Sequence, residues 1–396
     1  MRTRDEAGHH RASGVRVAAY TDYIYHREGD AVYAERAFAL FLARLGRDLE
    51  RLVVVGRLDP RAGRAHYRLP DALEFVALAH YESLAKPVAV AVALARSARR
   101  FWSVLGEVDT VWLLGPHPLS LAFAVLARLR GRRIVLGVRQ DLPAYVRSRH
   151  PRRRWIHLAG DALERAWLIL ARRHEAIVVG PELARRYAGA GRVLELSVSL
   201  IAESDLASAE AVASRSYDGE LRALSVGRLE REKNPLLLAD VLAALPETWR
   251  LVVCGEGPLA SALEDRLRRL GVAERAELRG YVPIDGGLHD LYRSSHAFLH
   301  VSWTEGLPQV LFEAFAGRLP VVATDVGGVA AAAKDAALLI PPGDAHAAAV
   351  ALQRLAAASE LRARLIEAGF ELVRRRTLEA ECDRVAAFLA GDLAPG

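Results

Sequence analysis

Cysteine is nearly absent from the chain, and its scarcity excludes two classes of fold. Cys254 and Cys382 are the only cysteines among 396 residues. A disulfide framework and a cysteine-rich zinc site both need more than two, so we expect neither. Cys254 ends an apolar segment that reads Leu-Val-Val-Cys, where we expect a small buried side chain rather than a reactive thiol.

Long apolar runs are missing as well. Residues 88–95 form one of the longest, and this run is far shorter than the roughly 20 residues of a membrane-spanning helix. The first fourteen residues are polar and lack the apolar segment of a secretory signal, so we expect a cytoplasmic protein. With 52% hydrophobic and 26% charged residues, the chain can form two or three domains with their own cores.

Lysine is scarce throughout, and acidic residues are scarce in the first half. Residues 1–200 contain 33 Lys and Arg against 20 Asp and Glu, whereas residues 201–396 contain 21 against 28. A GC-rich genome explains the preference for arginine over lysine but not the difference between the halves. A basic half indicates an anionic partner, namely a membrane surface, a nucleic acid or a phosphorylated substrate. No nucleic-acid motif is present, and few aromatic residues lie among the basic ones, so we expect no nucleic acid.

Short β-branched segments alternate with helical patterns along the chain. In the first half we predict strands over 15–20, 51–55, 73–77, 110–114, 133–138, 176–179 and 193–198, and helices over 87–105, 119–130 and 162–173. In the second half we predict strands over 221–226, 250–254, 276–278, 297–301, 321–324 and 338–340, and helices over 235–245, 259–270, 288–294, 309–316, 345–358 and 378–389. Such alternation predicts parallel sheets with helices on both faces.

We therefore expect an α/β fold with two Rossmann-like, doubly wound parallel-sheet domains that face a central cleft. The polar segment 200–219 is the predicted linker between domain 1–200 and domain 201–376. Because open α/β sheets bind ligands at the carboxyl ends of their strands, we expect the site in the cleft.

A partial dinucleotide-binding fingerprint occurs in the second domain. Residues 255–260 read Gly-Glu-Gly-Pro-Leu-Ala after a predicted strand. The complete fingerprint places an acid about twenty residues further on, at the end of the next strand. That strand ends at Arg279-Gly280-Tyr281, which contains no acid, so we do not expect a nicotinamide cofactor.

Two cations follow the first strand of the second domain. Gly227 allows the backbone to turn, and Arg228 and Lys233 stand in the following loop. A guanidinium and an ammonium together suit a diphosphate. Solvated loop cations are the plainer interpretation when this motif is taken alone.

Two glutamates flank a turn further along the chain. Glu305 precedes Gly306-Leu307-Pro308, and Glu313 lies in the helix that we expect to start near Pro308. The free N–H groups of a helix start bind anions, and an acid on that helix can reach the hydroxyls of a ribose. A loop acid and an ordinary helix acid are the alternative.

These segments, taken in order, resemble the group 1 (family 4 type) glycosyltransferases. The resemblance is carried by Gly227-Arg228 with Lys233, residues 255–258, Glu305 with Glu313 around residues 306–308, and residues 320–328; it covers about residues 220–345. It implies the GT-B fold and a retaining enzyme that uses a nucleotide sugar. It also implies that residues 377–396 form a helix that crosses back to the first domain.

The resemblance also implies roles for single residues. Arg228 and Lys233 would bind the donor diphosphate and stabilise it as it leaves, and Glu313 would bind the ribose. Glu305 and the backbone of Gly306, Leu307 and Pro308 would contact the donor sugar. Gly255, Tyr281 and Val282 would lie near the nucleotide, the last two near its base.

The acceptor side departs from the family pattern. Family members often carry paired glycines after the first strand and a His-Asp pair after the fifth, whereas this chain has Thr21-Asp22-Tyr23 and Arg139-Gln140-Asp141. His117, after the predicted strand 110–114, is the residue that we expect nearest the reaction centre. A loop histidine bonded to backbone is its alternative.

We thus predict transfer of a sugar from a nucleoside diphosphate to a small-molecule, saccharide or lipid-linked acceptor. No Asp-x-Asp motif occurs, so we expect neither a metal nor another cofactor. A nucleotide-sugar epimerase and a non-catalytic nucleotide-sugar-binding protein are the alternatives.

A basic run suggests attachment to the inner face of the cell membrane. Residues 147–154 contain five arginines and a histidine, and Trp155, Trp167 and Ile169 follow. Basic residues beside apolar ones can bind an anionic membrane surface. A solvated loop followed by a core helix is the alternative.

Overall fold

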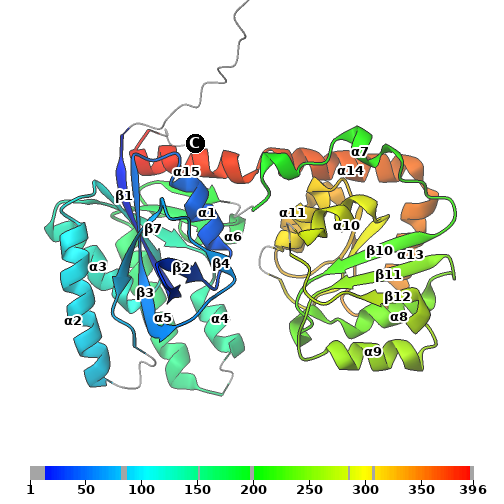
Figure 1. Ribbon diagram of the computed structural model, residues 1–396, viewed down its shortest axis with the longest axis horizontal. Helices are drawn as coiled ribbons and strands as arrows, with labels where there is room; N and C mark the ends of the chain where they lie inside the picture. Colours follow the sequence, from blue (N-terminus) through cyan, green and yellow to red (C-terminus); the bar gives the residue numbers. More distant parts are fainter. Residues whose placement is uncertain are drawn as a thin grey trace, which may run out of the picture. The chain divides into compact units, whose positions relative to one another are not determined.

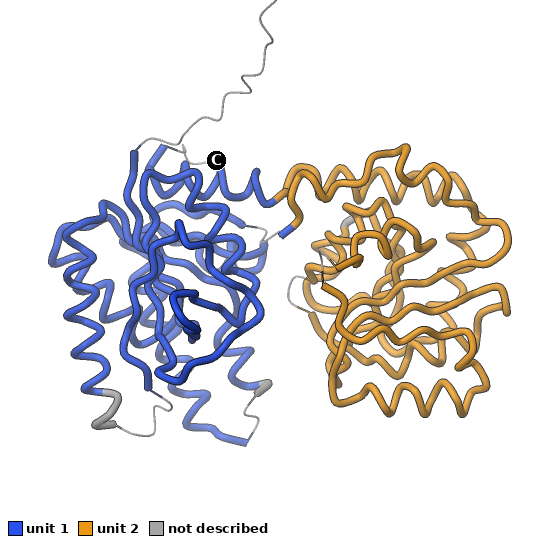
Figure 2. The backbone as a smooth tube through the Cα atoms, in the orientation of Figure 1, with its two compact units in different colours: residues 1–200, 378–396 blue, residues 201–377 orange. Residues whose placement is uncertain are grey.

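The computed structural model describes residues 14–81, 87–149, 152–196, 200–283, 286–305 and 308–392. The chain divides into two compact units, coloured separately in Figure 2. Unit 1 comprises residues 1–200 and 378–396, and unit 2 comprises residues 201–377. The last helix, α15 (Leu378–Ala390), therefore belongs to unit 1 although it follows unit 2 in the sequence.

Helix α15 packs on unit 1 through both apolar and polar contacts. Cys382 is fully buried, with its Sγ 3.7 Å from the carbonyl oxygen of Phe41 in α1 (Phe38–Leu45). The Thr110 hydroxyl donates to the carbonyl of Leu389, and the Arg133 guanidinium donates to the carbonyls of Phe388 and Leu389. These bonds satisfy carbonyls at the end of α15, which have no partner within the helix.

Unit 1 is built on one mixed sheet with helices on both faces (Figure 1). Seven strands run parallel in the order β5 (Glu74–Leu78), β3 (Arg51–Ala62), β1 (Arg16–Glu28), β6 (Thr110–Gly115), β7 (Arg133–Val138), β8 (Glu175–Val179) and β9 (Val193–Leu196). The helices are α1, α2 (Pro87–Val104), α3 (Pro118–Leu129), α4 (Leu142–Arg149), α5 (Arg154–Ala171), α6 (Pro181–Arg186) and α15.

The first strand is much longer than its apolar segment. We predicted a loop after Tyr20, but β1 continues to Glu28 and turns at Gly29-Asp30 into the antiparallel strand β2 (Ala31–Ala34), which pairs with β4 (Tyr67–Arg68). The extension is stabilised by pairing with β3 and by Thr21 and Tyr25, which are buried and hydrogen-bonded to each other at 2.8 Å. The predicted parallel sheet is therefore present, with an antiparallel addition formed by β2 and β4 that we did not predict.

Unit 2 contains six parallel strands in a doubly wound order. The order is β12 (Ala276–Leu278), β11 (Trp249–Cys254), β10 (Leu221–Val226), β13 (Ala297–His300), β14 (Val321–Thr324) and β15 (Ala337–Ile340). The helices are α7 (Ala209–Ala213), α8 (Leu236–Ala244), α9 (Ala260–Arg269), α10 (Leu288–Ser294), α11 (Gln309–Ala316), α12 (Val329–Ala333), α13 (Ala345–Ala357) and α14 (Ser359–Arg374). Counted along the chain, the strands have the spatial order 3-2-1-4-5-6, which is the Rossmann order.

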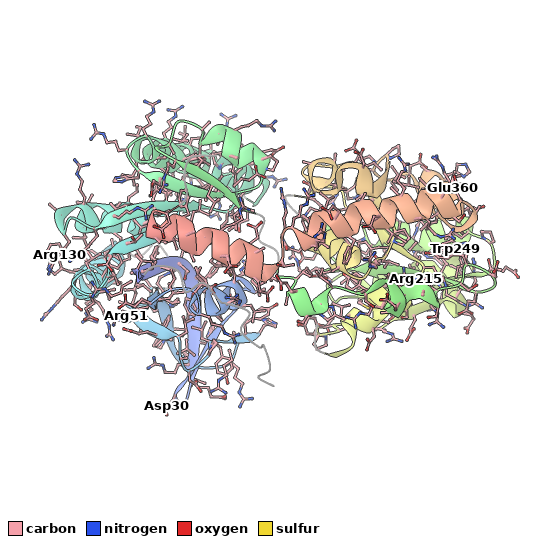
Figure 3. The ribbon with its side chains drawn as sticks, turned by 90° about the horizontal axis from the view of Figure 1, so that it is seen from above. Asp30, Arg51, Arg130, Arg215, Trp249 and Glu360 are labelled. Carbon is pink, nitrogen blue, oxygen red and sulfur yellow. The ribbon has the colours of Figure 1, made fainter. Side chains whose placement is uncertain are left out.

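Segment 200–219, which we predicted as the linker between the domains, belongs to unit 2 from residue 201 onward. It contains a 3₁₀ turn (Glu203–Asp205) and α7, and it packs on unit 2. Arg215, labelled in Figure 3, donates to the backbone carbonyls of Arg318 and Arg293 at 2.6 Å and of Gly317 at 3.2 Å. One guanidinium thus satisfies the ends of two helices, and this fixes a segment whose composition is that of a loop.

The basic run 147–154 is helical at its two ends. Helix α4 ends at Arg149, and α5 begins at Arg154, eight residues before the predicted start at residue 162. His150 and Pro151 lie outside the described residues. In the described part of the chain, no helix combines the length and the apolar character that a membrane crossing requires.

Candidate functional site

A cavity lies in unit 2 where the strand order reverses. Strands β10 and β13 are neighbours in the sheet, and the chain leaves their carboxyl ends in opposite directions along it. This reversal is where doubly wound sheets bind their ligands. The cavity has a volume of about 280 Å³ and is lined by Ser225, Val226, Gly227, Arg228, Leu229, Lys233, Pro235, Leu238, Val253, His300, Val301, Ser302, Glu305, Pro308, Gln309 and Val310.

The loop after β10 supplies one wall and both predicted cations. Residues Arg231–Lys233 form a 3₁₀ turn that ends at Asn234, whose φ of +51° is a left-handed value that asparagine tolerates. Arg228 is 63% exposed and is held by Glu230 at 2.5 Å and Glu232 at 3.2 Å. Arg228 is therefore part of the cavity lining, and two carboxylates already balance its charge.

The carboxylate of Glu305 is the centre of a buried network. Its Oε1 accepts hydrogen bonds of 2.6 Å from Lys233 Nζ and from Ser302 Oγ, and it lies 3.0 Å from His300 Nε2. The side chain is only 7% exposed. Burial alone would raise the pKa of Glu305, but His300, Lys233 and Ser302 outweigh it and lower the pKa to about 2. The group is an anion, and Lys233 is paired with it rather than free.

Two glycines make this arrangement possible. A Cβ on Gly255 would lie 1.8 Å from the carbonyl oxygen of Gly227, and a Cβ on Gly327 would lie 2.0 Å from the carbonyl oxygen of Glu305. In both places a neighbouring loop approaches the cavity wall more closely than any side chain allows. Gly255 therefore positions Gly227, and it does not itself line the cavity.

Of the eleven predicted site residues of unit 2, five line the cavity, four do not, and two lie outside the described residues. Gly227, Arg228, Lys233, Glu305 and Pro308 are brought together, whereas Gly255, Tyr281, Val282 and Glu313 of unit 2 are not in its lining. The other two, Gly306 and Leu307, lie outside the described residues.

Glu313 is directed toward α10. It accepts a 2.7 Å hydrogen bond from the Tyr292 hydroxyl, and burial raises its pKa although that bond opposes the shift. Tyr281, after β12, is 59% exposed, while Val282 is partly buried against the core. Neither the ribose contact of Glu313 nor the base contact of Tyr281 follows from the cavity lining, and both stay predictions.

His117 lies in unit 1 and caps α3. Its Nδ1 accepts from the backbone N–H of Leu119 at 3.2 Å and lies 3.2 Å from the Tyr20 hydroxyl. Burial lowers its pKa to about 4 despite the nearby Asp22, and Arg57 adds to the lowering. The alternative interpretation, a histidine bonded to backbone, is what the structure contains, and a role in catalysis stays a prediction.

Sequence reasoning missed His300 and Ser302. Both line the cavity and contact Glu305. The signal was available in part, because residues two apart at the end of a strand point to one face. The sequence did not reveal that the side chain of Glu305, three residues after Ser302, contacts both of them.

One family model matches part of the chain. Residues 208–372 match the family model described as glycosyl transferases group 1. The matched segment covers most of unit 2 and contains every residue of the cavity lining.

Two relatives match parts of the chain. TuaC of Bacillus subtilis, whose name assigns it to teichuronic acid biosynthesis, is 36% identical over 133 residues, 33% of this chain and 32% of that protein. A Campylobacter jejuni N-acetylgalactosaminyltransferase, whose name includes a diphospho-undecaprenol-linked glycan, is 31% identical over 102 residues, 25% of this chain and 27% of that protein. The chain thus spans about a third or less of the length of these relatives.

The whole chain resembles a solved structure. The crystal structure of Anabaena Alr3699/HepE in complex with UDP is similar over 95% of this chain and 100% of that chain, with a TM-score of 0.69 and 16% identity. At this identity the likeness concerns the fold. Both units together have the GT-B fold of two Rossmann-like domains.

In the parts of the chain that the structure describes, no three His, Cys, Asp or Glu side chains are grouped as metal ligands would be.

Proposed function

We propose that the protein transfers a sugar from a nucleoside diphosphate to an acceptor hydroxyl, with retention of configuration. The C–O bond between the sugar and the diphosphate breaks, a bond to the acceptor oxygen forms, and the acceptor proton leaves. The observation that carries the proposal is the cavity in the segment that matches the group 1 model, where Lys233, Glu305 and the start of α11 converge. The setting would be bacterial glycan, glycolipid or glycoside biosynthesis, in line with the names of the relatives.

The donor diphosphate would lie between Lys233, Arg228 and the first N–H groups of α11. Negative charge grows on the diphosphate as the sugar leaves, so donors already aimed at it lower the barrier. Glu305 and the backbone of residues 306–308 would hold the sugar, and Glu313 the ribose, with the base near Tyr281 and Val282. No step of this scheme uses a metal.

Because Lys233 is paired with Glu305, the carboxylate would compete with the diphosphate for the Lys233 ammonium. The Lys233 side chain is 25% exposed, and its ammonium lies 2.6 Å from the carboxylate. A bound diphosphate would draw Lys233 away, and the carboxylate would then be available to the hydroxyls of the sugar. One network would thus bind both parts of the donor.

Product analysis tests the proposal. The protein is incubated with nucleotide sugars, first alone and then with saccharide and lipid-linked acceptors. A new glycoside that forms only with acceptor supports transfer, and NMR of its anomeric carbon reports retention. A changed sugar without acceptor points to an epimerase, and binding without turnover points to a non-catalytic protein.

We also propose that unit 1 binds an anionic membrane surface through the outer face of α5. Its inner face, which includes Gly160, Glu164 and Trp167, is buried. On the opposite side Trp155, Leu158 and Ile169 are 68%, 71% and 64% exposed. We call these three apolar side chains the α5 stripe. Exposed basic residues lie in the same helix and just before it: Arg152, Arg153, Arg154 and Arg165.

An apolar helix face edged by arginine fits the boundary between lipid head groups and acyl chains. Such an attachment would place the enzyme at the inner face of the cell membrane, where lipid-linked acceptors lie.

A further inference from the structure

A second group of polar side chains gathers in unit 1 at the carboxyl edge of its sheet. We call it the Arg57–Arg139 cluster; it consists of Tyr20, Asp22, Arg57, Tyr81, His117 and Arg139. Strands β1 and β3 carry the first three, and the others follow β5, β6 and β7. These strands are neighbours in the sheet, and their carboxyl edge is where α/β sheets bind ligands.

The cluster has more positive than negative charge. Arg139 Nη2 donates to Asp22 Oδ1 at 2.8 Å, and its guanidinium lies 4.4 Å from the centre of the Tyr23 ring. Arg57 Nη2 donates to the backbone carbonyl of Asp22 at 2.9 Å, and its guanidinium lies 4.6 Å from the centre of the Tyr81 ring. The pair thus brings two guanidiniums to the cluster, against the single carboxylate of Asp22. In the described part of unit 1, Asp22 is the one carboxylate bonded to this pair.

Both arginines also hold an unused donor. The Nε atoms of Arg57 and Arg139 are buried and have no hydrogen-bond partner in the described part of the chain. Buried N–H groups are usually paired, so these two show that the cluster's own residues do not use every donor of the two arginines. The Arg139 side chain is 25% exposed, which leaves it accessible.

His117 adds a neutral donor. Because Nδ1 accepts from the Leu119 N–H, the proton of the uncharged ring is on Nε2. The nearest hydroxyl to that nitrogen, Tyr81 Oη, is at 3.5 Å, which is long for a hydrogen bond. A ligand oxygen can therefore also accept from His117.

We propose that the Arg57–Arg139 cluster binds a phosphate-type anionic group of the acceptor. Two guanidiniums and a neutral imidazole N–H match the several acceptor oxygens and the multiple charge of a phosphate better than they match a single carboxylate. The identification of the anion as part of the acceptor rests on the proposed function, whereas anion binding itself does not. The phosphate could come from a sugar phosphate or from a lipid-linked diphosphate.

Calorimetric titration of the full-length protein with methyl phosphate tests the site. We expect saturable binding that weakens about tenfold or more in Arg57→Gln and in Arg139→Gln, the loss typical of a charged hydrogen bond. Arg16→Gln is the matched control, because Arg16 begins β1 at the opposite edge of the same sheet and also pairs with an aspartate, Asp109. It should leave the affinity unchanged.

A third variant distinguishes loss of the binding site from misfolding. Asp22→Asn removes the competing negative charge with little change of shape, so we expect tighter binding of methyl phosphate, a change that misfolding does not produce. Absence of saturable binding to the natural protein, equal losses in Arg16→Gln, or weaker binding in Asp22→Asn would overturn the proposal.

Two further ligands distinguish the sources of the phosphate. Glucose 1-phosphate that binds more tightly than methyl phosphate supports a sugar phosphate as the acceptor. Geranyl diphosphate that binds more tightly than methyl phosphate supports a lipid-linked acceptor. Lys233→Ala is titrated in parallel to subtract binding at the cavity of unit 2. If neither ligand binds more tightly than methyl phosphate, the assignment to an acceptor is wrong. No titration depends on turnover, so anion binding without sugar transfer would refute the proposed function and leave the site standing.

Discussion

At the scale of single residues, Lys233 and Arg228 are unequal although the sequence presents them as a pair. Lys233 is mostly buried and bonded to Glu305, whereas Arg228 is 63% exposed and balanced by Glu230 and Glu232. We expect Lys233→Ala to lower kcat about ten- to a hundredfold, the loss of one charged hydrogen bond to the leaving group. Arg228→Ala should lower it less.

Steady-state kinetics with a saturating donor measures this difference. Arg231→Ala is the control, since Arg231 is an exposed cation of the same 3₁₀ turn and is absent from the cavity lining. Equal kcat values for the natural protein and Lys233→Ala would contradict the placement of the diphosphate.

The two glutamates separate binding of the nucleotide from binding of the sugar. Glu313→Gln should weaken both nucleoside diphosphate and donor, because the ribose belongs to both. Glu305→Gln should keep nucleoside diphosphate binding and lower turnover. Each lost bond corresponds to about ten- to a hundredfold, which calorimetry resolves. Glu264→Gln, on the exposed side of α9, is the control; reversed effects of the two variants would show that the pocket is misplaced.

His117 should make unit 1 sensitive to acid. Its folded pKa of about 4 lies below the ordinary value of 6.5, so between these pH values the unfolded chain binds more protons than the folded one. The contribution of His117 to the free energy of unfolding is therefore fully present above pH 6.5. It is lost as the pH falls toward 4, by up to about 3 kcal/mol.

Urea unfolding at pH 7, 5 and 4 measures this loss. His117→Asn keeps a good helix cap but cannot titrate, so its free energy of unfolding should fall less over the same range. A parallel fall in both proteins would assign the acid sensitivity to other groups.

At the scale of elements, the agreement between sequence and structure differs between the two units. The predicted strands and helices of unit 2, residues 221–358, all form, and their ends differ from the prediction by at most one residue. Each of these strands is short and apolar because both faces of a doubly wound sheet are covered. The pattern of residues is therefore a sufficient guide to such a sheet.

The same reasoning failed where contacts distant in sequence decide the structure. The second half of β1 is polar and is stabilised by pairing with β2 and β3. The α7 segment is fixed by Arg215, whose partners lie about a hundred residues further along. In the site, the order of motifs revealed Lys233 and Glu305, but not that the two are bonded to each other.

Helix α5 leads to a prediction about lipid binding. Vesicle binding should rise with the content of anionic lipid and fall with salt, because charges are screened over about 8 Å at physiological ionic strength. Trp155→Ala and Leu158→Ala should weaken it, and the fluorescence of Trp155 should shift to the blue on binding. Val350→Ala removes an exposed apolar side chain of unit 2 and serves as the control. Equal binding to neutral and anionic vesicles, or no binding to either, would contradict the proposal that the α5 stripe binds an anionic membrane.

At the scale of the whole molecule, the two units contain different candidate sites. Unit 2 contains the segment that matches the group 1 model, with its cavity, and unit 1 contains the Arg57–Arg139 cluster and the exposed face of α5. The excess of basic residues in residues 1–200 and of acidic residues in 201–396 follows the same division. Under the proposed function, unit 2 would bind the donor and unit 1 the acceptor.

The central claim is that the cavity of unit 2 binds a nucleoside diphosphate through Lys233. Thermal unfolding with a panel of nucleoside diphosphates tests it most directly, because a ligand at a hundred times its Kd stabilises the folded state by about 2.7 kcal/mol. We predict that one base raises the Tm of the natural protein and of Arg231→Ala clearly, and that of Lys233→Ala little. An unchanged Tm with every nucleoside diphosphate, or an equal rise in Lys233→Ala, would contradict the account.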